Sequence, residues 1–152
     1  PALLPHQHTP DGLRIGLASA QSVDSEFTRV VDSPVLRLQD GNFVEDPFVW
    51  QTGDGFEMLA KDMTGEITGE EHCGIHAHSD DGIEWTVSEP PKAYSRQVSC
   101  QDCTETVQGC LERPQLLLTQ GVPTHLFAAT ADGPGGFDNA ARTWNMVIPL
   151  ST

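Results

Sequence analysis

The sequence has few basic residues. Lysine and arginine together number 8 against 22 aspartates and glutamates, the formal net charge is −14, and only Lys61 and Lys92 are lysines. Nucleic acids and anionic membranes attract proteins through basic side chains, so this balance argues against both as partners. The excess of carboxylates suits a neutral ligand, or a surface kept soluble in high salt.

Long apolar runs are also missing. No stretch approaches the roughly 20 apolar residues that cross a bilayer as a helix, and no basic segment followed by an apolar one opens the chain. We therefore expect a soluble protein, cytoplasmic or exported, whose export signal was removed or never existed. A chain of 152 residues has the size of one ordinary domain.

Cysteine is scarce, and its spacing is ambiguous. The four cysteines are Cys73, Cys100, Cys103 and Cys110, and "CQDC" has the two-residue spacing of zinc and redox motifs. A zinc site needs four ligands, and a redox motif needs a thioredoxin-like strand and helix around it. The sequence shows neither context, so we expect free thiols or one local disulfide and predict no metal site there.

Helical periodicity is almost absent, whereas short apolar runs recur between turn sequences such as "TPDG", "TGDG", "SDDG" and "TQGV". This pattern predicts an all-β protein. The expected strands lie at about 13–19, 27–31, 46–50, 55–61, 73–78, 84–87, 112–118, 123–130 and 143–149.

The order of these strands repeats along the chain. Residues 43–90 read as strand, tight turn, strand, long polar loop, strand, turn and closing strand, and residues 110–150 begin the same order again. Four-stranded units of about 40 to 50 residues are typical of propeller blades. We predict a single partial β-propeller over 1–152, with a partial blade at 1–40, a complete blade at 43–90 and a further blade at 110–150.

So few blades do not close a ring, because closed propellers have about four to eight of them. An open end exposes unpaired strand groups and an apolar blade face, which tends to associate with another surface. We therefore expect a homodimer or other homo-oligomer, or else a piece of a longer chain.

Two segments combine carboxylates, a proline and an apolar strand: "EDPFVW" from residue 45 and "ERPQLLL" from residue 112. The first strand of each blade lines the central channel, so we place Asp46 and Glu112 at equivalent positions, one blade apart, at one channel mouth. Glycosidic bonds are hydrolysed by paired carboxyl groups, one protonated and one ionised. This pairing predicts a catalytic pair for a carbohydrate substrate.

The loops after second strands, and the link between blades, return to the same mouth. They offer charged, amide and aromatic groups of the kind that bind sugar hydroxyls and rings. The candidate substrate-binding residues are Lys61, Asp62, His72, Arg96, Arg113, Trp144 and Asn145. His76 and His78 face away from the channel, and we interpret them as structural or at most as a weak metal pair.

At these residues the sequence resembles a known family. "EDPFVW", "AKDMTGEITGEEHCGIHAHSDDGIEW", "ERPQLLL" and "TWNMVIPL" are similar to the five-bladed propeller glycoside hydrolases of families 43 and 32, in particular bacterial sucrase-like proteins. The resemblance covers about residues 10–150. It implies that Asp46 is the Asp that holds the substrate or tunes the acid, and that Glu112 is the general acid.

The family's third carboxylate, an Asp of the first blade that acts as base or nucleophile, has no counterpart. Asp11 sits in a "TPDG" turn and not at the head of an inner strand. The chain is then part of a longer enzyme, half of a dimer that shares carboxylates, or a non-catalytic carbohydrate-binding or assembly protein. We expect burial and Asp46 to raise the pKa of Glu112, and hydrogen bonds to keep Asp46 ionised.

The resemblance implies no cofactor, with calcium in the central channel as an alternative, since some members of the clan hold an ion there. No loop of this sequence has the regular ligand spacing of an EF-hand. The expected substrate is a small or plant- or algal-type saccharide. The sugar, the linkage and the retaining or inverting outcome stay open.

Overall fold

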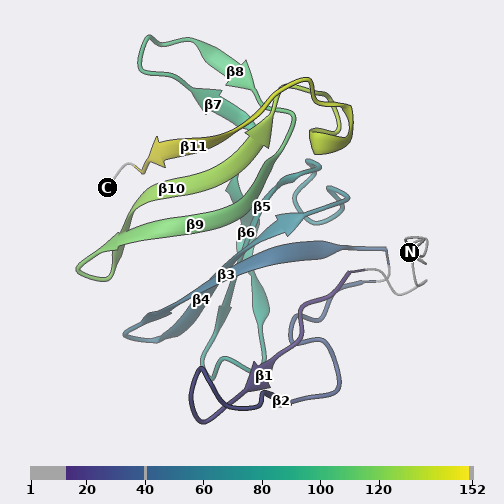
Figure 1. The fold of residues 1–152 in the computed structure, drawn as a ribbon, viewed down its shortest axis with the longest axis vertical. Coiled ribbons are helices and arrows are strands. Elements are labelled where there is room, and N and C mark those ends of the chain that lie inside the picture. Colours follow the sequence, from purple (N-terminus) through teal and green to yellow (C-terminus); the bar gives the residue numbers. More distant parts are fainter. Residues whose placement is uncertain (1–12, 40, 151–152) are drawn as a thin grey trace.

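The structure is a computed structural model that describes residues 13–39 and 41–150. The described chain is almost entirely β-structure in several antiparallel sheets (Figure 1). The predicted all-β class is confirmed, and the arrangement is consistent with a partial propeller. The division of the chain into blades stays a prediction.

Two sheets form the body of the molecule. The first has the order β3-β4-β5-β6, with β3 at Val44–Thr52, β4 at Gly55–Asp62, β5 at Cys73–Ser79 and β6 at Thr86–Tyr94. The second has the order β11-β10-β9, with β9 at Leu111–Thr119, β10 at Val122–Ala131 and β11 at Thr143–Pro149, and the short 3-10 helix η1, Gly136–Asn139, precedes β11. In both sheets the first strand along the chain is an edge strand that pairs with the second through a tight hairpin.

The chain before β3 covers one face of the first sheet. Its expected strands shrink to two-residue pieces, β1 at Ala18–Ser19 and β2 at Thr28–Arg29, whose side chains are exposed. The rest of the segment contributes apolar side chains, and its Leu36 forms a parallel bridge with Trp85. The resulting core contains Ile15, Val35, Leu36, Val44, Met58, Ile75 and Trp85.

The region after β5 differs from the sequence-based expectation. The strand expected at 84–87 continues as β6 to Tyr94, because a bulge accommodates the two prolines: Ala77 pairs with Val87 and Ile75 pairs with Lys92, so that residues 88–91 lie opposite a single residue of β5. A proline in an unpaired bulge loses no ladder hydrogen bond.

A hairpin that the sequence did not predict follows β6. It consists of β7, Gln97–Ser99, and β8, Glu105–Val107. Cys100 and Cys103 are exposed at its tip, and all four cysteines are free thiols.

The second core lies between the two sheets and holds their inner strands together. Its buried residues are Val98, Leu111 and Ala128, with Tyr94, Met146 and Ile148 packed around them. The Tyr94 ring lies against Gly74, where a side chain would occupy the same space, and its hydroxyl donates to the carbonyl of Leu111 at 3.4 Å. Strands β3 and β9 contact each other and begin on the same side of the molecule (Figure 1).

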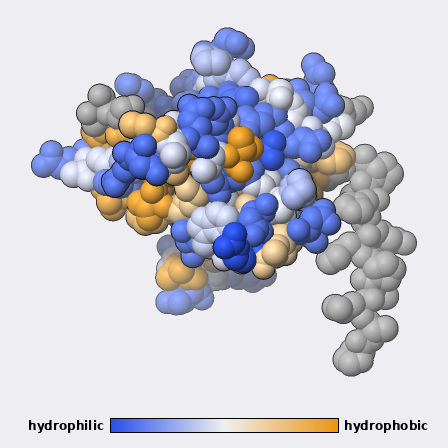
Figure 2. Space-filling model, turned by 90° about the horizontal axis from the view of Figure 1, so that it is seen from above, coloured by the Kyte–Doolittle hydropathy of each residue, from blue (hydrophilic) through white to orange (hydrophobic). Residues whose placement is uncertain are grey.

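The surface reflects the acidic composition. Seen from above, it is mostly hydrophilic, with hydrophobic side chains in small separate groups (Figure 2). Among the described residues, no helix is long and apolar enough to cross a membrane.

Candidate functional site at the start of the inner strands

A bulge at the start of β3 shapes the site. Glu45 pairs with Lys61 and Phe48 pairs with Leu59, which leaves two residues of β3 opposite one of β4. The first bulged residue is Asp46, with a φ of 56°. Bulges with such backbone angles redirect side chains at functional sites.

The same bulge recurs at the start of β9. Glu112 pairs with Ala129 and Gln115 pairs with Phe127, and the first bulged residue is Arg113, with a φ of 52°. The sequence-based equivalence of Asp46 and Glu112 is therefore wrong by one residue. Glu112 corresponds to Glu45, which sequence reasoning missed, and aligning Pro47 with Pro114 would have found this.

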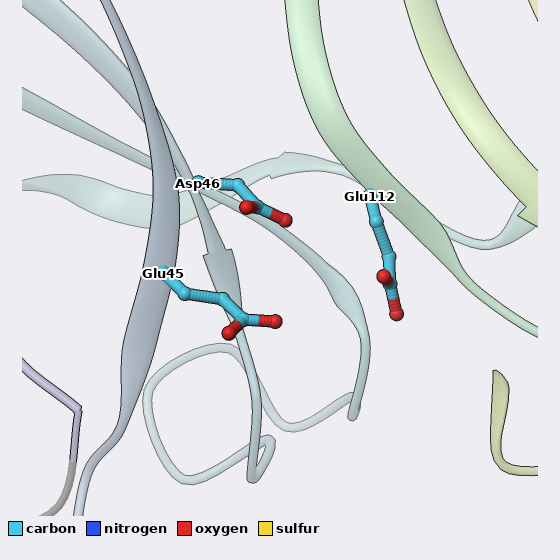
Figure 3. A group of neighbouring side chains, drawn as sticks. All are labelled: Glu45, Asp46 and Glu112. Atoms are coloured by element: carbon cyan, nitrogen blue, oxygen red, sulfur yellow. The ribbon is translucent and has the colours of Figure 1, made fainter. Parts of the chain in front are cut away.

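The carboxylates of the two strands converge all the same. One oxygen each of Glu45, Asp46 and Glu112 lies within 4.8 Å of the others, and the three side chains point into the space between β3 and β9 (Figure 3). Glu112 is buried, with 5% of its surface exposed, whereas Glu45 and Asp46 are partly buried. The structure thus brings together the two residues predicted to be catalytic.

Lys61 carries the positive charge of this cluster. Its side chain is 3% exposed, and its ammonium pairs with the Glu112 carboxylate and lies 3.0 Å from Oε1 of Glu45. Buried carboxylates need such compensation, because an unpaired charge in the interior is costly. The ammonium already neutralises two of the three carboxylates that calcium would require, so the donor set does not fit that ion.

The pKa of Asp46 is raised above its ordinary value. Burial is the main cause and the charge of Glu45 adds to it, while the charges of Arg113 and Lys61 act in the opposite direction. Among the described residues, Oδ2 of Asp46 has no hydrogen-bond partner. The hydrogen bonds expected to keep Asp46 ionised are therefore absent at this oxygen, and Asp46 holds a proton more readily than an ordinary aspartate.

His72 connects the cluster to both sheets. Its backbone has a φ of 59°, its N–H donates to the Asp62 carbonyl at 2.8 Å, and its carbonyl accepts from the N–H of Leu111 at 3.1 Å. Burial and then the charge of Lys61 lower the pKa of the imidazole, and the charge of Glu112 opposes them. The ring therefore favours its neutral form beside the carboxylates.

Two of the predicted substrate-binding residues are engaged within the protein. The buried Asp62 carboxylate accepts N–H groups of the β4–β5 loop, at 2.9 Å from Gly65 and 3.0 Å from Thr68. The main-chain N–H of Arg96 donates to Glu70 at 3.0 Å, and its guanidinium reaches main-chain carbonyls at 3.3 and 3.4 Å. In this arrangement both residues hold the segments that border the cluster.

The last three predicted residues lie on the second sheet. The Arg113 side chain is 62% exposed, lies 3.8 Å from Oε2 of Glu112 and stacks over the Phe137 ring at 5.6 Å. Asn145 pairs with Ala129, the partner of Glu112, so these side chains share one face of the sheet. Trp144, 40% exposed, alternates to the opposite face.

The comparisons with known proteins support the fold. No family model and no curated protein match the chain in sequence. A solved structure named "Glycoside hydrolase" is similar, with a TM-score of 0.64 and 15% identity, as is a solved complex of BT0996 with RGII, with a TM-score of 0.65 and 15% identity. Each match covers 93% of this chain and 36% of the other. The chain thus has a fold found in a solved glycoside hydrolase and spans about a third of that protein's length.

The raised pKa of Asp46 predicts a pH-dependent stability. Protonated Asp46 is favoured in the folded state, so its contribution to stability is present below the ordinary carboxyl range, near pH 4, and is lost as the pH rises through the higher folded pKa. Asp46→Asn removes the ionisation. We expect the free energy of unfolding of Asp46→Asn, minus that of the natural protein, to increase from pH 4 to 7. Urea titrations across this range measure it, and a constant or decreasing difference contradicts it.

Proposed function

We propose that this chain is a glycoside hydrolase module in which Glu112 and Asp46 act on a glycosidic bond of a small or plant- or algal-type saccharide. One observation carries the proposal: carboxylate oxygens from the first strands of two sheets lie within 4.8 Å of each other. They do so at the start of both strands, in a fold shared with a solved glycoside hydrolase.

The short separation assigns different roles to the carboxyls. The catalytic pair of a retaining glycosidase is about 5 to 5.5 Å apart, and that of an inverting one about 6.5 to 9.5 Å. Glu45, Asp46 and Glu112 lie closer than either, within 4.8 Å. Asp46 therefore suits a residue that tunes the acid Glu112 or holds the substrate, and the base or nucleophile must come from outside this cluster.

We propose that a second copy of the chain supplies the missing group in a homodimer or other homo-oligomer. The outer face of the second sheet supports association, because Leu117, Phe127 and Val147 lie on it with 47%, 39% and 53% of their surface exposed. Apolar groups side by side on an open sheet face favour contact with another protein surface.

A second candidate function is carbohydrate binding without hydrolysis. The ion pair between Lys61 and Glu112 favours it, because a carboxylate held by an ammonium is not poised to donate a proton. The two candidates differ in one observable: whether reducing sugar is released from a bound saccharide.

Replacement of Glu112 tests the catalytic role. Glu112→Gln should reduce hydrolysis of unactivated saccharides by at least about 100-fold, the usual contribution of a general acid, and should affect nitrophenyl glycosides less, because their leaving group needs no proton. Rates of sugar and nitrophenol release measure both effects. The variant should still fold, because Lys61 keeps Glu45 at 3.0 Å.

Glu26→Gln, on the exposed segment before β3, is the matched control and should have natural activity. Equal activity of Glu112→Gln and the natural protein on unactivated saccharides would overturn the assignment. Saccharide binding with no release by the natural protein, measured by calorimetry and a reducing-sugar assay, would establish the second candidate instead.

The proposed assembly predicts a particle with twice the mass of one chain, or a higher multiple. Light scattering coupled to gel filtration measures this mass. Phe127→Asp places a charge in the exposed apolar face and should shift the particle toward the monomer, whereas Val23→Asp, at a side chain 84% exposed before β3, should not. A natural protein that elutes as a single monomeric species contradicts the proposal.

A further inference from the structure

We propose a second, separate site in which Ser88, His76 and Glu57 form a nucleophilic triad that hydrolyses short-chain carboxylic esters. The three residues come from neighbouring strands of the first sheet: Glu57 from β4, His76 from β5 and Ser88 from β6. This activity is independent of the proposed glycosidase. Glu57 lies four residues before Lys61 on β4, roughly 13 Å along the strand.

The distances match the arrangement of a serine nucleophile, its base and an orienting acid. The Ser88 Oγ lies 2.9 Å from Nδ1 of His76, and Oε2 of Glu57 lies 2.7 Å from Nε2 of the same ring. The Trp50 ring stacks on the imidazole with centroids 6.2 Å apart. Each ring nitrogen therefore faces one partner while the indole restricts the ring's rotation.

The carboxylate determines which nitrogen carries the proton. Glu57 beside Nε2 favours the tautomer with hydrogen on Nε2, which leaves Nδ1 free to accept the proton of Ser88. Oε2 of Glu57 has no regular hydrogen bond in this arrangement, so its contact with the ring is electrostatic. Such contacts commonly align only when substrate is bound.

The triad opens into a cavity of suitable chemistry. Ser88 and His76 are part of the wall of a cavity of about 430 Å³ between the two sheets, whose lining is mostly apolar and includes Leu59, Leu116 and Leu126. Ligand sites combine such an apolar lining with a few placed polar groups. A short acyl chain fits this lining, with its carbonyl carbon at Ser88.

The bulge in β6 gives Ser88 its special position. Residues 88–91 lie opposite His76 alone, so Ser88 and Glu89 are outside the pairing register of β5. Their main-chain N–H groups are the donors nearest in sequence to the nucleophile, and Pro90 and Pro91 have none. We assign these N–H groups to the negative oxygen that develops during attack.

The reaction balances with water as the only co-reactant. Oγ of Ser88 forms a bond to the carbonyl carbon and its proton passes to Nδ1 of His76; the C–O bond of the ester then breaks, and the alcohol leaves with that proton. Water attacks the acyl-serine, His76 takes its proton and returns it to Ser88, and the carboxylic acid is released. Glu57 stabilises the imidazolium in both steps.

Covalent labelling of the full chain tests the assignment. An alkyl fluorophosphonate should modify Ser88, as identified by peptide mass mapping, and 4-nitrophenyl butyrate should be hydrolysed with saturation. Ser88→Ala should abolish the labelling, and His76→Ala should lower ester hydrolysis at least about 100-fold. Ser99→Ala and His78→Ala, at exposed positions on β7 and β5, are the matched controls and should leave both unchanged.

Glu112→Gln should also leave the ester hydrolysis unchanged, which separates this site from the proposed glycosidase. Circular dichroism spectra confirm that the variants are folded. Absence of a Ser88 adduct in the natural protein, or the same ester hydrolysis in folded Ser88→Ala and Ser99→Ala, would overturn the proposal.

Discussion

The buried ammonium of Lys61 is the interaction on which the site depends. Three carboxylates from two strands lie within 4.8 Å of one another, and their mutual repulsion would separate β3 from β9 without a positive charge between them. Lys61 extends from β4, pairs with Glu45 on β3 and reaches Glu112 on β9. A single side chain thereby links three strands and both sheets at the end where the candidate catalytic groups lie.

The two bulges are the local structure that makes this possible. In each first strand the residue before the proline takes a positive φ, and the preceding glutamate, Glu45 or Glu112, stays in register with the second strand. The second strand offers Lys61 at this rung in the first sheet and Ala129 in the second. The asymmetry leaves room for one lysine to serve both glutamates, which explains why the repeated pattern gives one cluster and not two.

Strand order was predictable because alternating apolar runs and glycine-containing turns are local signals, and six of the nine expected strands match β3, β4, β5, β9, β10 and β11. The course of β6 was not, because Pro90 and Pro91 indicate a strand end unless a bulge places them outside the ladder. The meeting of Asp46 and Glu112 followed from the repeat. The roles of Lys61 and Asp62 did not, since only the tertiary structure shows that an ammonium is buried between strands and that a carboxylate accepts the N–H groups of its own loop.

A double-mutant cycle between Lys61 and Glu112 tests this account most directly, through free energies of unfolding in urea. Lys61→Met in the natural background should cost about 3 to 5 kcal/mol, because it leaves buried carboxylates without their cation. In the Glu112→Gln background the same change should cost less, by about 1 to 3 kcal/mol, because the two residues interact directly. An equal cost of Lys61→Met in both backgrounds would show that the ammonium does not join the two sheets, and would contradict the account.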